Sequence, residues 1–295
     1  MKGIILAAGK GTRLYPMTRP VCKPLLPVYD KPLIYYSVSI LIEAGIREIL
    51  VIVPPGEEHV FQALLGDGSQ WGVSIAYAVQ LVPRGIADAM LVGAEFIGQD
   101  SVCLVLGDNI FYGNGFSKIL KSAVSNAENK GRCTVFGYYV PDPERFGIVE
   151  FDANGKVLSV EEKPQHPKSN YAITGLYFYN KEVVKMAKQV KPSARGELEI
   201  TTLNDMYLKQ DELDVQLLGR GFAWLDTGTM DSLVEAADFV RMIEKRQGIK
   251  ISAPEEIAFK YGWIDRDTLL ESAERYGKSP YGQHLKNVAD GKLKY

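Results

Sequence analysis

The sequence predicts an α/β protein in which a mostly parallel sheet is covered by helices on both faces. Over the first 140 residues, short apolar runs alternate with segments that repeat apolar residues at helical spacing. The runs are continuously apolar, as in Val102–Leu106, rather than alternating with polar residues. Such runs are typical of strands in a parallel sheet that is buried on both sides.

The first half of the chain contains five predicted strands and four predicted helices. A strand at Ile4–Leu6 leads into a glycine-rich loop. Asp30-Lys31-Pro32 has the pattern of an N-cap followed by a proline in the first turn, and Gly45 ends the helix that it begins. The remaining elements are strands at Glu48–Val53, Val73–Val79, Val102–Leu106 and Thr134–Val140, and helices at His59–Leu65, Ala87–Ala94 and Phe116–Ala127.

From about residue 145 the pattern changes to shorter strands. Ile148–Phe151 and Val157–Val160, joined by Asp152-Ala153-Asn154-Gly155, predict a β-hairpin. The strands that follow are Tyr171–Tyr179, Val215–Leu218 and Phe222–Leu225. The predicted helices are Lys181–Gln189, Glu197–Lys209, Pro254–Tyr261 and Thr268–Tyr276. A further, long helix begins after an N-cap at Thr229 and runs through Arg246. We therefore expect an α/β core over residues 1–240, with small β insertions, and a helical C-terminal extension over residues 241–295.

Composition excludes several classes of protein. The 295 residues are 46% apolar and carry a net charge of −2, so no overall basic field would attract nucleic acid. No apolar run approaches the roughly 20 residues of a membrane span. The chain enters its first strand directly after the N-terminus, so we expect a cytoplasmic protein without a membrane segment. Three widely spaced cysteines, Cys22, Cys103 and Cys133, predict reduced thiols.

The loop after the first strand, Gly9-Lys10-Gly11-Thr12-Arg13-Leu14, is the strongest candidate for chemistry. Its glycines let the backbone approach a ligand, and its lysine and arginine place positive charge on either side, which suits phosphate. Leu14 stands where a dinucleotide-binding loop has its third glycine, and the second strand ends at Val53-Pro54 without an acidic residue. An NAD-dependent oxidoreductase is therefore disfavoured. On its own, the loop fits a structural turn as well as a phosphate site.

The segment LAAGKGTRLYP, followed by Lys23-Pro24-Leu25-Leu26-Pro27, resembles the sugar-1-phosphate nucleotidyltransferases, in which a G-x-G-T-R loop wraps a nucleotide triphosphate. Further matches occur in the expected order along nearly the whole chain: LLGDG at 64–68, LGDN at 106–109, DPERFG at 142–147, EEKP at 161–164, SNYAITGLYFY at 169–179, RGELEIT at 195–201 and GRGFAWLDTGT at 219–229. Within this family the chain looks most similar to the members that make dTDP-glucose and pyrophosphate from dTTP and glucose 1-phosphate.

This resemblance implies a Rossmann-like core, dependence on Mg²⁺ and, usually, a homotetramer. It implies a place at the first step of dTDP-deoxysugar biosynthesis, which feeds polysaccharide synthesis. Close members also carry a second, allosteric nucleotide site between subunits. For that site we consider the Gly219-Arg220-Gly221 segment and the C-terminal helices.

The resemblance assigns the nucleotide to residues 1–140. The implied contacts are Leu6, Ala8, Gly9, Gly11, Thr12, Arg13, Lys23, Gln80, Gly85 and Asp108. Arg13 would stabilise the departing pyrophosphate, since a guanidinium is planar, always charged and can donate twice to phosphate. Lys23 would be a second cation. Gln80 would read the pyrimidine edge together with the backbone of Gly85, because an amide both donates and accepts.

Two aspartates follow apolar strands, and these are candidates for a metal site. Asp108 follows Val102–Leu106, and Asp226 follows Phe222–Leu225. Ligands bind at the carboxyl ends of strands in open α/β sheets, and Mg²⁺ prefers oxygen ligands. From spacing alone, turn or cap positions are favoured over a metal site for both aspartates, because 118 positions separate them. The family match favours the metal reading.

The resemblance assigns the sugar phosphate to residues 141–228. The implied contacts are Gly147, Glu162, Lys163, Ile173, Arg195 and Trp224. Lys163 would hold the phosphate, with Arg195 as a second cation. Glu162 would accept hydrogen bonds from sugar hydroxyls. Arg13, Lys23, Asp108, Lys163 and Asp226 would together form the catalytic set.

Two alternative functions stay open. One is a relative that uses UTP, because the sequence departs from the usual thymidylyltransferase pattern near the nucleotide, at Ala8, Pro24 and Arg84-Gly85. The other is a non-catalytic sensor of nucleotide sugars on the same fold. A sensor would be expected to lose the loop arginine or one of the two aspartates, and all three are present.

Overall fold

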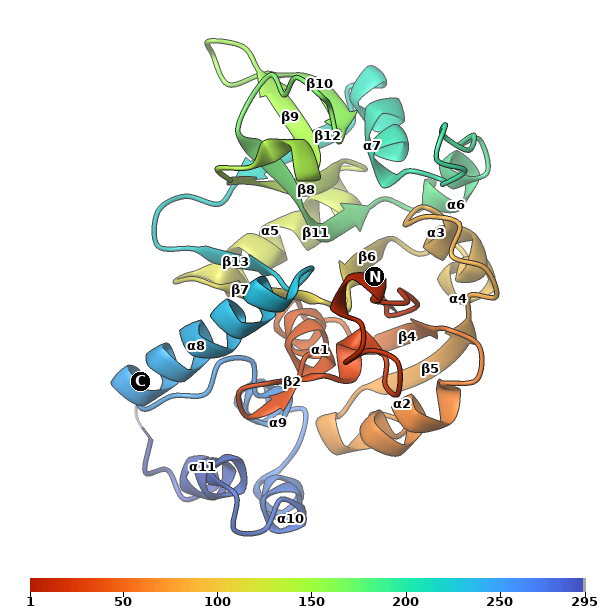
Figure 1. The fold of residues 1–295 in the computed structure, drawn as a ribbon. Coiled ribbons are helices and arrows are strands. Elements are labelled where there is room, and N and C mark those ends of the chain that lie inside the picture. The colour runs from red at the N-terminus through yellow and green to blue at the C-terminus, as the bar shows by residue number, and fades with distance from the viewer. Residues whose placement is uncertain (294–295) are drawn as a thin grey trace.

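The centre of the protein is a parallel sheet, as predicted. We describe residues 1–293 of a computed structural model. Four strands, β1 (Lys2–Leu6), β4 (Glu48–Val53), β5 (Ser74–Val79) and β6 (Val102–Leu106), lie parallel in the order β6-β1-β4-β5. Figure 1 shows this order around the N-terminus. The carboxyl ends of β1 and β6 therefore lie side by side, at the place where the glycine-rich loop and Asp108 begin.

Antiparallel strands extend this sheet to nine. They are β8 (Cys133–Tyr139), β9 (Gly147–Phe151), β10 (Val157–Glu162) and β11 (Tyr171–Tyr179), with β12 (Leu213–Leu217) parallel to β8. β11 runs antiparallel to β6, and on its other side it pairs with both β8 and β9. The β9–β10 hairpin that the sequence predicts is confirmed. The result is a mixed sheet with a parallel core.

Helices cover both faces of the sheet, as predicted. Those of the core are α1 (Ile34–Glu43), α2 (Glu58–Leu65), α3 (Asp88–Val92), α4 (Ala94–Ile97), α5 (Phe116–Asn129), α6 (Val183–Ala187) and α7 (Ile200–Lys209). Neighbouring residues of β1 belong to different apolar clusters. Ile5 packs with α1 and α5, whereas Ile4 packs with α3, α6 and α7. This alternation explains why the strand is apolar at consecutive positions.

A separate two-stranded sheet was only half predicted. β13 (Ala223–Asp226) pairs antiparallel with β7 (Asn109–Tyr112), and Asp226 lies opposite Asn109. The sequence predicts β13 but gives no strand at 109–112, because the Gly107-Asp108 turn reads as the end of the preceding strand. The pairing of β7 with β13 places Asp226 beside Asp108.

The predicted N-cap at Asp30 is wrong. Lys31–Pro32 forms a short strand, β3, paired with β2 (Pro27–Val28), and α1 begins only at Ile34. The Asp30 carboxylate accepts hydrogen bonds from Lys31 and Lys250. An ion cluster formed with a distant part of the chain has therefore replaced the local cap. Four 3₁₀ turns complete the core: η1 (Thr12–Leu14), η2 (Lys23–Leu25), η3 (Ser69–Trp71) and η4 (Pro143–Arg145).

The C-terminal part is helical, as predicted. Thr229 caps α8 (Met230–Gln247) in a capping box with Ser232. It is followed by α9 (Pro254–Lys260), α10 (Arg266–Arg275) and α11 (Pro280–Ala289), which lie at the opposite end of the molecule from the β9–β10 hairpin (Figure 1). α11 was not predicted, although Ser279 followed by Pro280 is a typical helix start.

Two further expectations can be compared with the described residues. Cys22, Cys103 and Cys133 are all free, as predicted, and all three are buried. Over residues 1–293, none of the helices is both long enough and apolar enough to cross a membrane.

Candidate active site

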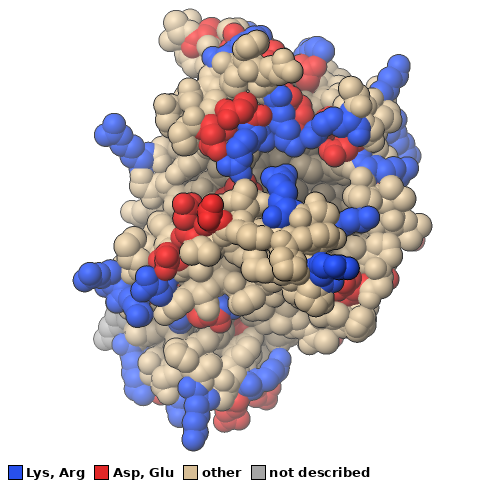
Figure 2. Space-filling model, viewed as in Figure 1, with Lys and Arg blue, Asp and Glu red and all other residues tan. Residues whose placement is uncertain are grey.

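A pocket of about 390 Å³ opens beside the carboxyl ends of β1 and β6 and reaches the β9–β10 hairpin. Basic side chains gather around a hollow in the middle of this face of the molecule (Figure 2). The pocket brings together most of the residues that the sequence analysis selects. Those that line it are Leu6, Gly9, Gly11, Thr12, Arg13, Lys23, Asp108, Gly147, Glu162, Lys163, Ile173, Trp224 and Asp226.

The structure places the other four selected residues outside this lining. Ala8 is buried, and Gly85 packs against the backbone of Leu198. Gln80 is buried and donates from Nε2 to Asp88 Oδ2 at 2.8 Å. Arg195 donates to Glu162 and Glu199. Their roles in binding stay predictions.

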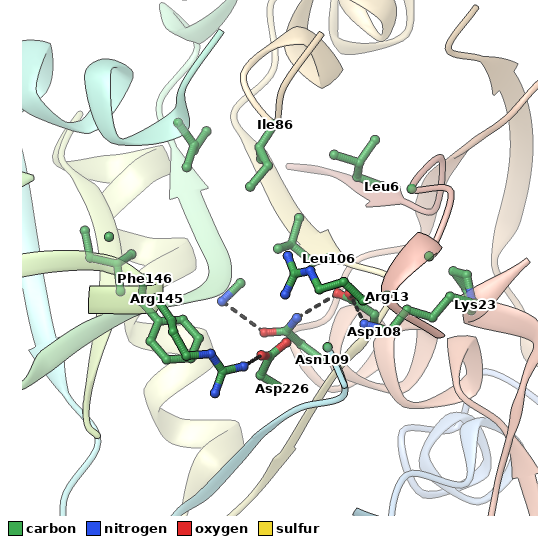
Figure 3. A pocket seen from close by; sticks show the side chains of 18 of the residues that line it. Leu6, Arg13, Lys23, Ile86, Leu106, Asp108, Asn109, Arg145, Phe146 and Asp226 are labelled. Atoms are coloured by element: carbon green, nitrogen blue, oxygen red, sulfur yellow. Dashed lines mark hydrogen bonds and ion pairs between the residues drawn. The ribbon is translucent and has the colours of Figure 1, made fainter. Parts of the chain in front are cut away.

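The glycine-rich loop is shaped to present Arg13 to the pocket. Gly11 has a φ of +59°, and a β-carbon there would lie 3.1 Å from Thr18 and 3.2 Å from Lys23. Leu14, at the position that disfavours dinucleotide binding, is fully buried in the cluster that contains Tyr36. Because Leu14 anchors the η1 turn, the preceding side chain of Arg13 is held at the surface, where its guanidinium points into the pocket (Figure 3).

The two aspartates that 118 positions separate in the sequence meet at this pocket. The β7–β13 pairing sets their approach, and Thr227 Oγ1 donates to the carbonyl oxygen of Asp108 at 2.9 Å. Asp108 Oδ2 is 2.6 Å from Lys23 Nζ, and Asp226 Oδ2 is 3.3 Å from Arg145 Nη2 (Figure 3). Each carboxylate therefore has a basic partner.

The pKa of Asp226 depends on its burial and on the charged groups around it. Burial raises the pKa of Asp226, and the negative charge of Asp108 raises it further. Lys23, Arg145 and Arg13 oppose the rise. Over residues 1–293, no group of three or more His, Cys, Asp or Glu side chains is placed to hold a metal ion. A cation here would have two carboxylates as its protein ligands.

Asn109 is a site residue that the sequence analysis missed. Its Oδ1 accepts from Trp224 Nε1 at 2.6 Å and from the Gly175 amide at 3.1 Å, and its Nδ2 donates to Asp108 Oδ1 at 2.9 Å. A buried amide with all three contacts fixes the orientation of the Asp108 carboxylate. The signals in the sequence are its position directly after Asp108 and its place in the matched LGDN segment.

The sugar-phosphate half of the predicted site lies at the end of β10. Glu162 Oε2 accepts from Thr201 Oγ1 at 2.5 Å, and Oε1 lies 3.2 Å from Arg195 and 3.7 Å from Lys163. Lys163 has a φ of +43°, in the left-handed region that non-glycine residues rarely adopt. Its amide donates to the carbonyl oxygen of Phe146 at 2.9 Å. The chain therefore holds this lysine in an unfavourable backbone conformation at the pocket.

The pocket has further lining residues that the sequence analysis did not select. They are Ala7, Leu14, Pro24, Ile86, Leu106, Asn109, Arg145, Phe146, Gly175, Tyr177, Ile200, Thr201 and Gly228. Arg145 is the charged residue among them. It lies within the matched DPERFG segment, and that match was the available signal.

The chain is similar to known proteins over most of its length. A family model described as "Nucleotidyl transferase" matches residues 2–242. The chain is 59% identical over 285 residues to a glucose-1-phosphate thymidylyltransferase of Neisseria meningitidis serogroup A. The aligned part is 97% of this chain and 98% of the relative. Over 285 residues it is 54% identical to a protein of the same name from Mycobacterium tuberculosis strain H37Rv, again covering 97% and 98%.

Two solved structures have the same fold. One is described as a putative glucose-1-phosphate thymidylyltransferase from Bacillus anthracis in complex with a sucrose. It is 41% identical, with a TM-score of 0.75 over 82% of this chain and 95% of the other. The other is a UDP-glucose pyrophosphorylase complexed with UDP-glucose, which is 22% identical, with a TM-score of 0.72 over 82% of this chain and 98% of the other. At that identity, the second likeness concerns the fold alone.

Proposed function

The chain belongs to the nucleotidyl transferase family, and from this premise we propose that it transfers a thymidylyl group from dTTP to α-D-glucose 1-phosphate, giving dTDP-glucose and pyrophosphate. Relatives that are more than half identical over nearly their full length carry the name of this activity. The single structural observation that supports the proposal is the pocket itself. It gathers Arg13, Lys23 and Lys163 around two carboxylates.

The residues present fit Mg²⁺, which is the cation we propose for this site. The donor set is two carboxylates, Asp108 and Asp226, and hard cations such as Mg²⁺ bind through one or two carboxylates together with substrate phosphates. Burial and the charge of Asp108 raise the pKa of Asp226, and a cation bound between the two carboxylates would oppose this rise. When bound, Mg²⁺ would neutralise charge on the phosphate oxygens and help to orient them.

The reaction needs no covalent intermediate with the protein. A phosphate oxygen of glucose 1-phosphate attacks the α-phosphorus of dTTP in line, and pyrophosphate leaves. Because both reactants are polyanions, repulsion and alignment are the main obstacles. In our proposal Lys163 holds the attacking phosphate, while Arg13 and Lys23 stabilise the triphosphate and the departing charge.

Binding of the two substrates is assigned to the two halves of the pocket. The nucleotide lies on the glycine-rich loop. Gln80 and the backbone of Gly85, which lie outside the pocket lining, would read its base. The sugar hydroxyls donate to Glu162, assisted by backbone groups of Gly147 and Ile173 and bounded by Trp224. Arg195 would assist Lys163 with the phosphate.

One assay tests this function. Pyrophosphate release is measured with glucose 1-phosphate and either dTTP or UTP, with and without Mg²⁺. We expect release with dTTP that depends on Mg²⁺. Faster release with UTP would favour the uridylyltransferase alternative, and no release with either pair would favour the sensor.

We propose further that the protein is a cytoplasmic homotetramer that starts the synthesis of dTDP-deoxysugars such as dTDP-rhamnose. In this proposal residues 241–295 contribute contacts between subunits or to a regulatory nucleotide site. Light scattering of the purified protein measures the assembly, and a mass of one chain would contradict it.

A further inference from the structure

Both carboxylates of the pocket already have a cation in contact. Lys23 Nζ lies 2.6 Å from Asp108 Oδ2, and Arg145 Nη2 lies 3.3 Å from Asp226 Oδ2. These two carboxylates are the groups that the proposed function assigns to the metal, and the inference rests on that function. We infer that Lys23 and Arg145 are exchangeable counter-ions, which occupy the metal ligands until a triphosphate draws them away. Metal and nucleotide would then bind together.

Charge balance is the first argument. Two carboxylates and two basic side chains make the ligand-free site locally neutral. A divalent cation that arrives alone would have to displace both cations, and it would gain two carboxylates without the substrate phosphates that complete such a site for Mg²⁺. A triphosphate changes this balance, because its oxygens can accept the displaced cations and also supply ligands to the metal.

The anchoring of Arg145 is the second argument. This side chain lies on the η4 turn and lines the pocket beside Asp226 (Figure 3). Its Nη1 donates to Asp142 Oδ2 at 2.5 Å, and its guanidinium lies 5.1 Å from the ring centre of Phe146. The contact of Nη2 with Asp226 is longer. Arg145 can therefore release Asp226 while Asp142 and Phe146 still hold it at the pocket.

Lys23 is placed for the same exchange. Its side chain is 10% exposed and lies on the η2 turn, beside the glycine-rich loop that would receive the triphosphate. Within residues 1–293, Asp108 is the carboxylate with which Lys23 forms an ion pair. A short movement of the flexible stem would carry the ammonium from Asp108 to a phosphate oxygen at the same loop.

The inference predicts opposite changes in two affinities when Arg145 is replaced. Arg145→Gln should bind Mn²⁺ alone about tenfold more tightly than the unaltered protein, because Asp226 loses its competing cation; tenfold corresponds to about 1.4 kcal/mol. The same variant should bind metal-free dTTP, in EDTA, about tenfold more weakly, because a cation that the phosphates would use is gone. Arg145→Lys should lie close to the unaltered protein in both measurements.

Electron paramagnetic resonance of Mn²⁺ and calorimetry with dTTP measure the two affinities on the purified full chain. Arg132→Gln is the matched control, since Arg132 pairs with Asp214 away from the pocket. Adding Asp226→Asn to Arg145→Gln should abolish the gain in Mn²⁺ affinity. Unchanged or weaker Mn²⁺ binding in Arg145→Gln would overturn the inference, as would an equal gain in Arg132→Gln. Failure of the unaltered protein to release pyrophosphate with any nucleotide would instead contradict the proposed function.

Discussion

The position of Arg13 at the pocket depends on the next residue, Leu14. Leu14 is buried and holds the turn, so that the arginine is presented to the pocket. We expect Arg13→Ala to lose on the order of 10²–10³ in turnover, because one electrostatic partner of the leaving group is removed. Arg19→Ala is the matched control, as an exposed arginine of the same segment. Steady-state pyrophosphate release measures both, and near-normal turnover of Arg13→Ala would remove its assigned role.

Lys163 combines a charge with an unfavourable backbone conformation. Its φ of +43° costs an L-residue roughly 1 kcal/mol, whereas glycine adopts it freely. Lys163→Gly should therefore have a free energy of unfolding about 1 kcal/mol above that of Lys163→Ala, although both variants lose the ammonium and most turnover. Chemical denaturation and the pyrophosphate assay give the two quantities. Equal stability of the two variants would show that the backbone conformation carries no cost.

Asp226 connects function with stability through its raised pKa. The folded protein binds a proton on this carboxyl more tightly than the unfolded chain does, so its contribution to stability is present at low pH and is lost as pH rises through the folded pKa. At pH 7, Asp226→Asn should therefore raise the unfolding midpoint of the ligand-free protein by a few degrees while turnover is lost. The difference should shrink as the pH falls through the raised folded pKa and should be smallest at and below about pH 4, where the carboxyl is largely protonated in the unfolded chain as well. A lower midpoint than that of the unaltered protein at pH 7 would contradict this.

Among the elements, the β7–β13 pair determines the geometry of the site. Gly175 on β11 lies so close to β7 that a β-carbon there would be 2.5 Å from Asn109 Oδ1. Gly175→Ala should push Asn109 away, destabilise the protein by about 1–3 kcal/mol and lower turnover by disturbing Asp108. Gly219→Ala is the control, because a β-carbon there meets nothing within 4 Å. Thermal unfolding and turnover are compared, and equal effects of the two substitutions would refute the argument.

The elements also show what can be predicted from the sequence. The strands of the parallel core and the cap of α8 follow from local patterns, and the structure confirms them. β7 was not predicted, and the start of α1 was predicted wrongly, because each depends on a distant partner. The partner of β7 is β13, and that of Asp30 is Lys250.

Prediction of the candidate site is limited in the same way, by contacts between distant parts of the chain. Arg13, Asp108 and Asp226 were chosen from motifs and strand ends, and all three line one pocket. Asn109 and Arg145 were not chosen, because their importance arises from contacts with Trp224 and Asp226 that spacing along the chain does not reveal.

Over the whole molecule, the C-terminal helices are joined to the core by packing and by charge. Ala258, Leu269 and Leu285 share an apolar cluster with α1. A buried ion cluster links Asp30 and Lys31 of the core with Glu244 and Lys250, and Lys250 Nζ lies 2.5 Å from each of the two carboxylates. The C-terminal part therefore stabilises the segment that follows Lys23.

Lys250→Met tests this link. It leaves two carboxylates with one lysine in a poorly hydrated place, which should cost about 3 kcal/mol of unfolding free energy. Lys245→Met, an exposed lysine at the end of α8, is the control and should change stability little. Denaturation curves of both variants decide the matter. Equal midpoints would mean that the ion cluster does not hold the C-terminal part in place.

The pairing of β7 with β13 also determines when Asp108 and Asp226 can meet during synthesis of the chain. Asp108 leaves the ribosome early, but its partner Asp226 follows only after the whole of residues 113–222 has been made. At about 5–20 residues per second, this delay is on the order of ten seconds. A growing chain can fold its parallel core and glycine-rich loop in that time, yet it holds only one of the two carboxylates. If both carboxylates are needed, as we propose, an incomplete chain that lacks Asp226 is expected to leave nucleotide unconsumed until synthesis is nearly finished.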